Sequence, residues 1–255
     1  MTAGVHSASI QRLPGSAEVR AGLQEYCAAL AEAVGDGLVG VYLYGSLARG
    51  CFHPGTSDVD VVAVTEVPCS EAVISKIVTA HEEAGVPVDA TFATRSQIGV
   101  DETPTPVEFV LKSGGAERVV RLPEGHGDFL LQRQDVYDCD TAIVGEAARE
   151  VVRPVPWEAL ARCLDYLFPH IVPRFKNPAL MLSRMAYAFA NRKLCSKRTA
   201  GEWAMGVLGE EWRPLVAEAL EKYAAGVPDD RGPNERLRAF EEQCAGYIGE
   251  VRGAG

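Results

Sequence analysis

The chain has 255 residues, of which 47% are hydrophobic and 24% charged, and its formal net charge is −10. This is the composition of an ordinary soluble globular protein, and no apolar run approaches the roughly 18 residues that a membrane span needs. A strongly acidic chain argues against a protein whose main work is to bind the polyphosphate backbone of a nucleic acid. The sequence therefore favours small or cationic partners, and predicts neither a nucleic-acid nor a membrane partner.

The seven cysteines are scattered, odd in number and never in a C-x-x-C pair. This pattern indicates reduced thiols and argues against a zinc site or a disulfide framework. The first six residues lack the basic and apolar stretches of a secretion signal. We therefore expect a cytoplasmic protein. We also expect a monomer, because no exposed apolar stripe is left over once the predicted helices are packed.

The first half of the chain mixes helix and strand patterns. One helix is predicted from its cap Ser16 to Gly35, and a second from Ser70 to Gly85. The predicted strands are residues 39–44, 58–64 and 86–92, followed by a hairpin of residues 107–111 and 118–122 around Gly114-Gly115. Between the first two strands, Gly45-Ser46 breaks the first strand, and a short helical turn and a turn-rich loop follow.

The pattern changes near Val151. Residues 153–156, Arg-Pro-Val-Pro, read as a linker, and the patterns that follow are almost entirely helical. We therefore predict an α+β fold with two domains. Residues 1–155 form an N-terminal domain with a mixed sheet flanked by helices, and residues 156–255 form a C-terminal all-α helical bundle.

The stretch that indicates chemistry is Gly45-Ser46 followed, twelve residues after the serine, by Asp58-x-Asp60. Side chains alternate along a strand, so the two carboxylates face one side while Val59 faces the core. Adjacent carboxylates repel unless a cation lies between them, and oxygen ligands without histidine or thiolate favour Mg²⁺. A glycine lets the backbone approach a phosphate closely, and the Ser46 hydroxyl with free N–H groups of the short helix supplies donors for its oxygens.

A lone D-x-D motif is common, and the chain contains a second one, Asp138-Cys-Asp140. It lacks a preceding apolar strand and a Gly-Ser turn, so we interpret it as a solvated helix end. Asp89, flanked by apolar residues within a predicted strand, is the candidate for a third carboxylate. A buried carboxylate is costly unless its charge is compensated, as it is beside a metal, and it can accept a proton from an attacking hydroxyl.

The Gly45-Ser46 and Asp58-x-Asp60 unit resembles the polymerase-β nucleotidyltransferase superfamily. The second half is similar to the helical domain of aminoglycoside adenylyltransferases of the 3''/9 streptomycin–spectinomycin type. The segments that carry this similarity are Leu182-Ser-Arg184, Ser196-Lys197, Glu202-Trp-Ala-Met205 and Tyr223-Ala224. The resemblance extends from about Val39 to Ala224. It implies a nucleotidyltransferase domain followed by a helical bundle, with ATP and the acceptor held between them.

The resemblance also implies roles for individual residues. Asp58 and Asp60 would bind the metal, and Asp89 would be the third ligand and the general base. The residues implied at the nucleotide are Gly45, Ser46 and Ser57 at the triphosphate, Arg184 and Lys197 at the phosphates, Tyr223 near the nucleotide, and Asp128 lining its site. The implied reaction is Mg²⁺-dependent transfer of AMP from ATP to a hydroxyl of a small molecule, with release of pyrophosphate.

The sequence departs from this family at three places. Asp89 stands where the streptomycin-modifying enzymes carry a longer Glu, and Leu111-Lys112 stands where the family places a tryptophan against the drug. Arg174 and Lys176 lie in a segment that is acidic in those enzymes, and like charges are a usual means of excluding a ligand.

These departures leave several acceptors open. The sequence favours an aminocyclitol antibiotic as the acceptor, with resistance as the outcome, because the resemblance covers most of the chain. The alternative acceptors are a neutral or anionic small molecule in a natural-product pathway, and a protein or tRNA target as in toxin–antitoxin nucleotidyltransferases. A further alternative is a protein that binds the nucleotide as a sensor, without turnover.

Overall fold

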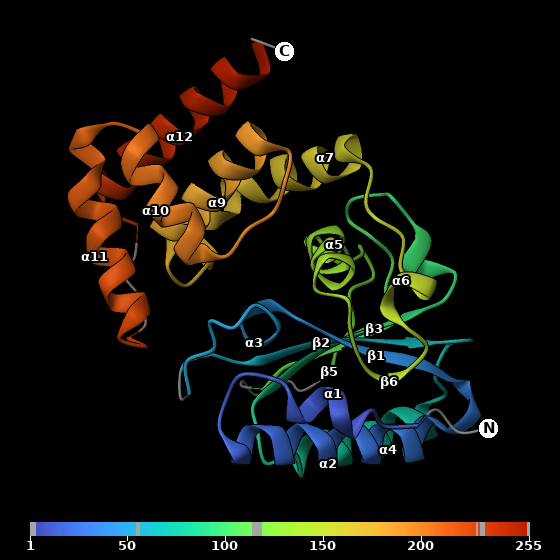
Figure 1. Ribbon diagram of the computed structural model, residues 1–255. Coiled ribbons are helices and arrows are strands. Elements are labelled where there is room, and N and C mark those ends of the chain that lie inside the picture. The colour runs from blue at the N-terminus through green and yellow to red at the C-terminus, as the bar shows by residue number, and fades with distance from the viewer. Residues whose placement is uncertain (1–3, 55–56, 114–118, 228, 230–232, 254–255) are drawn as a thin grey trace. The chain divides into compact units, whose positions relative to one another are not determined.

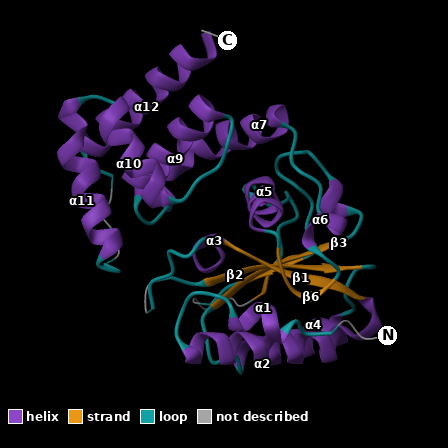
Figure 2. Ribbon diagram, viewed as in Figure 1, coloured by secondary structure: helices purple, strands orange, loops and turns teal. Residues whose placement is uncertain are grey.

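The computed structural model describes residues 4–54, 57–113, 119–227, 229 and 233–253. The chain divides into two compact units, Met1–Ala159 and Leu160–Gly255. All strands of the described residues lie in the first unit, and the second is built from helices (Figure 2). The predicted α+β class, a mixed sheet flanked by helices followed by an all-helical bundle, is confirmed. No helix of the described residues is long and apolar enough to cross a membrane.

The first unit is built on a six-stranded sheet with the order β5-β4-β3-β2-β1-β6. In chain order the strands are β1 (Leu38–Tyr44), β2 (Val59–Thr65), β3 (Val88–Thr94), β4 (Phe109–Leu111), β5 (Val119–Val120) and β6 (Thr141–Gly145). Only β2 and β3 run parallel, and every other described pair is antiparallel. A parallel pair brings the same end of both strands to one edge of the sheet, which positions the site described below.

Helices cover both faces of this sheet (Figure 1). In chain order they are α1 (Ser7–Gln11), α2 (Ala17–Val34), α3 (Gly45–Ala48), α4 (Glu71–Glu82), α5 (Phe129–Cys139) and α6 (Ala148–Val151), with 3₁₀ turns at Gly35–Gly37 and Gln97–Gly99. Helices α1, α2 and α4 lie on one face, and α5 and α6 lie on the other. The sheet is therefore the middle layer of three.

The two long helices on one face of the sheet, α2 and α4, begin where their serine caps predict. The Ser16 hydroxyl accepts from the Val19 N–H at 3.3 Å, and the Ser70 hydroxyl accepts from the Val73 N–H at 3.4 Å. Each bond satisfies one of the backbone donors that a helix leaves open at its first turn. The predicted helices after Ser16 and Ser70 are confirmed.

Alternation along β2 separates two hydrophobic cores. Val59, Val61 and Ala63 are fully buried against the α2–α4 layer, whereas Val62 and Val64 belong to the core beneath α5. Asp60 shares the α5 face with the second set, because side chains two residues apart point the same way. The predicted burial of the valines beside Asp60 is confirmed.

The segment 129–145 forms α5 and β6, two elements that the sequence patterns did not predict. Helix α5 ends at Cys139, with Asp140 as a left-handed C-cap, so the interpretation of Asp138-Cys-Asp140 as a helix end is confirmed. Strand β6 pairs antiparallel with β1 at the edge of the sheet. Strand β3 begins at Val88, two residues later than predicted, and β4 and β5 are shorter than predicted. The Gly114-Gly115 turn of the predicted hairpin lies outside the described residues.

The second unit is centred on α9. Its elements are α7 (Trp157–Leu167, which begins just before the unit boundary), a 3₁₀ turn (Phe168–His170), α8 (Ile171–Arg174), α9 (Pro178–Asn191), α10 (Lys197–Val207), a 3₁₀ turn (Glu210–Trp212), α11 (Arg213–Ala224) and α12 (Glu235–Gly253). Helix α9 contacts α8, α10, α11 and α12 and is buried along most of its length. Trp203 packs edge-on between Tyr187 and Tyr247, which joins α10 to α9 and α12.

Candidate active site

Three carboxylates gather at one edge of the sheet. Asp60 on β2 lies directly opposite Asp89 on the parallel strand β3. Asp58 precedes β2 by one residue and therefore projects to the same face as Asp60. All three side chains are half-buried, and all three lie at the N-terminal ends of their strands. The alternation expected from the sequence thus brings Asp58, Asp60 and Asp89 together.

Gly45 is packed against this group. It has φ +71°, which L side chains rarely adopt, and a Cβ at this position would overlap with the carboxylate of Asp60 and lie 2.9 Å from its Cγ. Residue 44, in turn, is paired with residue 60 in the register of β1 and β2. Only glycine fits here, because both its backbone angle and the space beside the carboxylate exclude a side chain.

A lysine and a serine at the end of β4 contact two of the three carboxylates. The Lys112 ammonium donates to Asp89 Oδ2 at 2.8 Å, and the Ser113 N–H donates to Asp89 Oδ1 at 2.8 Å. The Ser113 hydroxyl donates to Asp58 Oδ1 at 2.7 Å. Asp89 is 18% exposed and Lys112 46% exposed, so the ion pair opens to solvent on the lysine side. Ser113 links Asp58 to Asp89 across the intervening space.

The charges of this edge shift the pKa values of the groups around it. Burial raises the pKa of Asp89, but the hydrogen bonds from Lys112 and from the Ser113 N–H outweigh this and hold the pKa below its ordinary value. Burial, followed by the negative charges of Asp60 and Asp128, raises the pKa of Tyr44 well above its ordinary value. Asp89 is therefore an anion at neutral pH that can accept a proton, whereas Tyr44 remains neutral.

The carboxylate of Asp135 on α5 contacts the backbone of the Gly45-Ser46 turn. Its Oδ2 accepts from the Gly45 N–H at 3.1 Å, and its Oδ1 accepts from Arg49 Nε at 2.7 Å and from the Arg49 Nη2. The Gly45 N–H, one of the donors that the sequence assigned to a phosphate, thus donates to a carboxylate of the protein. The N–H groups of this short helix are not all free, because α5 supplies an acceptor that the local pattern does not reveal.

Asp128 stands at the N-terminus of α5 within a chain of polar contacts. Its Oδ1 lies 2.7 Å from His126 Nδ1 and accepts from Gln132 Nε2 at 3.2 Å. Gln132 Oε1 accepts from the buried Thr91 hydroxyl at 2.9 Å, which ties this chain to β3. Burial raises the pKa of Asp128, but the hydrogen bond and charge of His126 outweigh it, so the pKa is lowered. Asp128 therefore adds a further negative charge near Asp60 and Lys112.

The two serines assigned to the triphosphate lie between β1 and β2, Ser46 in the short helix α3 and Ser57 in the loop before Asp58. The Ser46 carbonyl accepts from the Cys51 N–H at 2.9 Å, which closes the turn after β1. The Ser57 hydroxyl accepts from the His53 N–H at 3.1 Å, and the Ser57 N–H donates to the His53 carbonyl at 2.9 Å. Ser57 therefore closes the loop immediately before Asp58.

In the second unit, three residues assigned to the nucleotide lie near one another. The Lys197 ammonium lies 5.8 Å from the centre of the Tyr223 ring, a cation–π contact between the start of α10 and the end of α11. Arg184 on α9 donates from Nε to the Cys195 carbonyl at 3.0 Å, two residues before Lys197. Two cations and an aromatic ring thus gather where α9, α10 and α11 meet, the chemistry of a phosphate- and base-binding surface.

The donor set at the sheet edge fits Mg²⁺ in its chemistry. Within the described part of the chain, no three His, Cys, Asp or Glu side chains already converge on a single metal position. Magnesium ordinarily needs only one or two carboxylates, and takes its remaining ligands from water and substrate phosphates. The all-oxygen pair Asp60 and Asp89, directly opposite each other in the register of β2 and β3, meets that requirement.

The sequence interpretation missed the role of two polar residues on α5. Gln132 and Asp135 are both buried, on the same helix as the buried residues Phe129 and Val136. Polar side chains that share a buried helix face need partners, and this would have marked them as part of a site. Lys112 appeared in the sequence only as a departure from the family, and its contact with Asp89 depends on the pairing of β3 and β4.

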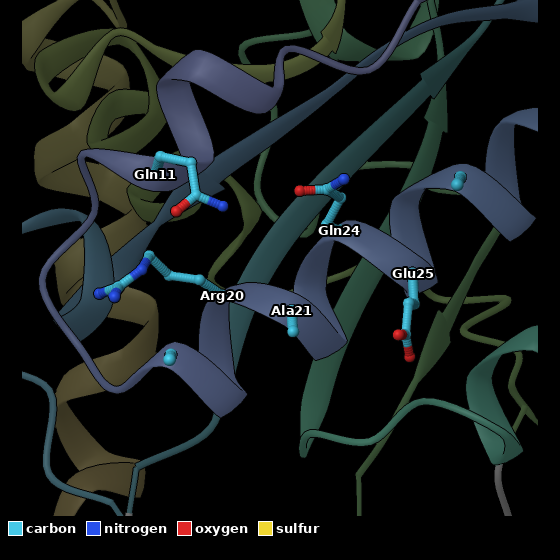
Figure 3. A pocket seen from close by; sticks show the side chains of 7 residues that line it. Gln11, Arg20, Ala21, Gln24 and Glu25 are labelled. Carbon is cyan, nitrogen blue, oxygen red and sulfur yellow. The ribbon is translucent and has the colours of Figure 1, made fainter.

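A surface pocket of about 340 Å³ lies along α1 and α2, on the side of the sheet opposite the carboxylates (Figure 3). Its polar side chains include Gln11, Arg20, Gln24 and Glu25. The Arg20 guanidinium donates to the Gly15 carbonyl at 2.6 Å, so its hydrogen bonding serves the loop between the two helices. No nucleophile or carboxylate pair accompanies it among these lining residues.

Two family models match the chain, one in each half. Residues 25–114 match the nucleotidyltransferase domain, and residues 150–246 match the C-terminal domain of aminoglycoside adenylyltransferase. The first match contains all three carboxylates, and the second contains Arg184, Lys197 and Tyr223.

Individual proteins match over most of their length. An aminoglycoside (3'') (9) adenylyltransferase from Escherichia coli is 26% identical over 93% of this chain and 97% of its own. A spectinomycin 9-adenylyltransferase from Staphylococcus aureus is 24% identical over 77% of this chain and 82% of its own. The fold resembles that of a spectinomycin adenyltransferase, AAD(9), from Enterococcus faecialis, solved with ATP and spectinomycin: TM-score 0.68, 16% identity, 91% of this chain and 98% of the other. The chain is thus a transferase enzyme of the nucleotidyltransferase type, and both of its halves resemble the aminoglycoside (3'') (9) adenylyltransferases.

Proposed function

We propose that this enzyme transfers AMP from ATP to a hydroxyl of a small molecule and releases pyrophosphate. The observation that carries the proposal is the register of β2 and β3, which sets Asp60 beside Asp89 with Gly45 packed against the first carboxylate. A backbone turn packed this closely against a pair of carboxylates suits a site where a metal ion is bound by both the carboxylates and the triphosphate.

Each residue of the sheet edge has a role in the proposed reaction. Asp58, Asp60 and Asp89 would hold Mg²⁺, which when bound offsets the negative charge of the triphosphate. Asp89 would accept the proton of the acceptor hydroxyl, for which its ionised side chain, partly exposed at the edge, is placed. Ser46 and Ser57 would donate to the triphosphate, and Asp128 would line the nucleotide site.

Three residues of the second unit would also contact the nucleotide. Arg184 and Lys197 would stabilise negative charge on the leaving pyrophosphate, and Tyr223 would pack near the nucleotide. Their grouping at the junction of α9, α10 and α11 supports a shared role. In a phosphoryl transfer of this kind, most of the catalysis is positioning and electrostatic stabilisation.

For the acceptor, we propose an aminocyclitol antibiotic of the streptomycin–spectinomycin type, with resistance as the outcome. The names of the E. coli and S. aureus relatives support it, as does the match across both halves of the chain. Residues of both units would contribute to the complete enzyme, and we propose that it acts as a cytoplasmic monomer.

Pyrophosphate release tests this proposal. The wild-type protein, Mg²⁺ and ATP are incubated with streptomycin, spectinomycin, other aminoglycosides, and neutral and acidic sugars. We expect turnover with a cationic antibiotic, and loss of at least about 10²-fold in kcat for Asp89→Asn, because the amide cannot accept the proton. Nucleotide binding without turnover against every acceptor would overturn small-molecule transfer in favour of a macromolecular target or a sensor.

A second acceptor class, neutral or anionic, is favoured by Lys112. Its ammonium lies 2.8 Å from the carboxylate that would deprotonate the acceptor, so an acceptor at Asp89 also lies beside a positive charge. In the second unit, Arg174 and Lys176 are both exposed, in a segment without acidic residues from 166 to 177. Cations at these positions would repel an acceptor that carries ammonium or guanidinium groups.

Replacing Lys112 by methionine tests this alternative. Like charges about 5 Å apart near a protein surface repel, and for a half-exposed lysine this amounts to about 1 kcal/mol, or roughly a fivefold to tenfold change in kcat/KM. We expect Lys112→Met to raise kcat/KM for cationic acceptors relative to neutral ones by this factor. Lys76→Met, on the exposed surface of α4, is the matched control. Equal effects on cationic and neutral acceptors would argue against charge selection by Lys112.

A further inference from the structure

A side chain of α5 fixes the backbone of the Gly45–Ser46 turn by a hydrogen bond. The buried Asp135 carboxylate, 5% exposed, accepts at Oδ2 from the Gly45 N–H and at Oδ1 from Arg49. Gly45 is the first residue of α3 and Arg49 is its C-cap, whose N–H donates to the Gly45 carbonyl at 3.1 Å. The Asp135 carboxylate therefore accepts hydrogen bonds from residues at both ends of α3, Gly45 and Arg49.

This contact is costly unless the charge of Asp135 is cancelled. The carboxylate is buried within hydrogen-bond distance of the turn that precedes Ser46, where a triphosphate would bring several more negative charges. Arg49 approaches it through two guanidinium nitrogens, Nε and Nη2, which both donate to Oδ1 and leave Oδ2 for the Gly45 N–H. Arg49 also lies 3.8 Å from Asp138, so it faces two acidic residues of the same helix.

We propose that Asp135 is a positioning residue of the nucleotide site, and that Arg49 cancels its charge so that a triphosphate can bind beside it. Asp135 fixes the peptide of Gly45, and thereby the direction of Ser46, without contacting substrate. Arg49 is committed to the protein and is not itself a phosphate ligand. The inference rests on the proposed nucleotidyl transfer, and it adds Asp135, which lies outside both matched ranges, together with its partner Arg49.

The Arg49 role is tested by a double-variant cycle on ATP affinity, measured by calorimetry with Mg²⁺ and without acceptor. Arg49→Met leaves the Asp135 charge uncancelled, so we expect the Kd for ATP to rise at least about tenfold. Adding Asp135→Asn removes that charge, and the double variant is expected to return to within about threefold of the wild type. A double variant as weak as Arg49→Met alone would mean that Arg49 contacts the nucleotide directly, and would overturn this role.

The Asp135 role is tested by comparing alanine with asparagine at this position. Asparagine keeps an oxygen for the Gly45 N–H, whereas alanine removes it. We expect kcat to fall at least about tenfold in Asp135→Ala and clearly less in Asp135→Asn, with the KM for the acceptor unchanged in both. Thermal unfolding and circular dichroism identify any variant that fails to fold. If Arg49→Met does not fold, Arg49→Lys replaces it. Lysine keeps the charge but offers one nitrogen in place of two, so we expect a Kd for ATP between those of the wild type and a variant without the charge.

Arg95→Met is the matched control. Arg95 forms ion pairs with Glu66 at 2.9 Å and Glu146 at 2.6 Å, at the opposite ends of the same strands, and its loss is expected to leave ATP binding unchanged. Folded Arg49 and Asp135 variants with the wild-type Kd and kcat would overturn the positioning role alone. A wild-type protein that binds no nucleotide would instead overturn the proposed function, and the positioning role with it.

Discussion

Asp60→Asn is expected to lower kcat by at least about 10²-fold to 10³-fold, because it removes one of two facing carboxylates at the point where charge must be stabilised. The side chain keeps its size, so Gly45 still packs against it. We expect the thermal midpoint to stay the same, since the change removes one of several neighbouring negative charges. Pyrophosphate release and thermal unfolding of the same preparation measure both quantities.

The chain provides a matched control for this substitution. Asp140 is also the second aspartate of a D-x-D sequence, but it caps α5 in a left-handed conformation that asparagine adopts well. Asp140→Asn should therefore leave kcat within about twofold of the wild type, as expected for a surface position. If Asp60→Asn retained most of its activity, the sheet edge would not be the catalytic site.

Arg133→Met is expected to lower the free energy of unfolding of the first unit by about 3–5 kcal/mol. Arg133 on α5 is 2% exposed. Its guanidinium donates to the carbonyls of Ile98 at 3.0 Å and Val100 at 2.9 Å, and pairs with Asp101. Methionine fills much of the space but satisfies none of these acceptors, so two backbone carbonyls lose their donor in the interior.

Urea denaturation followed by circular dichroism measures this loss. The chain has two compact units, so the transition of the first unit must be separated before a free energy is assigned. Arg198→Met is the control, because Arg198 is exposed and pairs with Glu202 one turn along α10, and its replacement should leave the midpoint unchanged. A loss below about 1 kcal/mol for Arg133→Met would mean that the carbonyls of Ile98 and Val100 find other donors.

Much of the carboxylate edge follows from local rules. Alternation along a strand predicts that Asp58 and Asp60 share a face, and the apolar neighbours of Asp89 predict that it lies in the sheet. Serine caps likewise predict where α2 and α4 begin. These rules involve neighbours within a few residues, and a single sequence contains that information directly.

The partners of these carboxylates depend instead on contacts between distant segments. Asp135 meets Gly45 across 90 positions of sequence, and Ser113 meets Asp58 across 55. Both contacts require the packing of α5 on the sheet or the pairing of β3 with β4, neither of which has a local signature. The pattern of α5 is also atypical, because buried Gln132, Arg133 and Asp135 interrupt its apolar face. The sequence therefore predicts which residues are reactive more completely than which residues hold them in place.

The one-to-one pairing of β2 and β3 restricts which changes of length the site can tolerate. Asp60 and Asp89 share a face only while both strands keep the same count of residues from their paired ends. One residue inserted between Val88 and Asp89 would turn the carboxylate toward the core that contains Val88 and Ala90, and would bring an apolar side chain to the site. Substitutions at this edge alter the chemistry by degrees, whereas a single insertion or deletion removes it at once. Natural variation in the acceptor is therefore expected in the residues after β4, such as Lys112, and not in the spacing of the two aspartates.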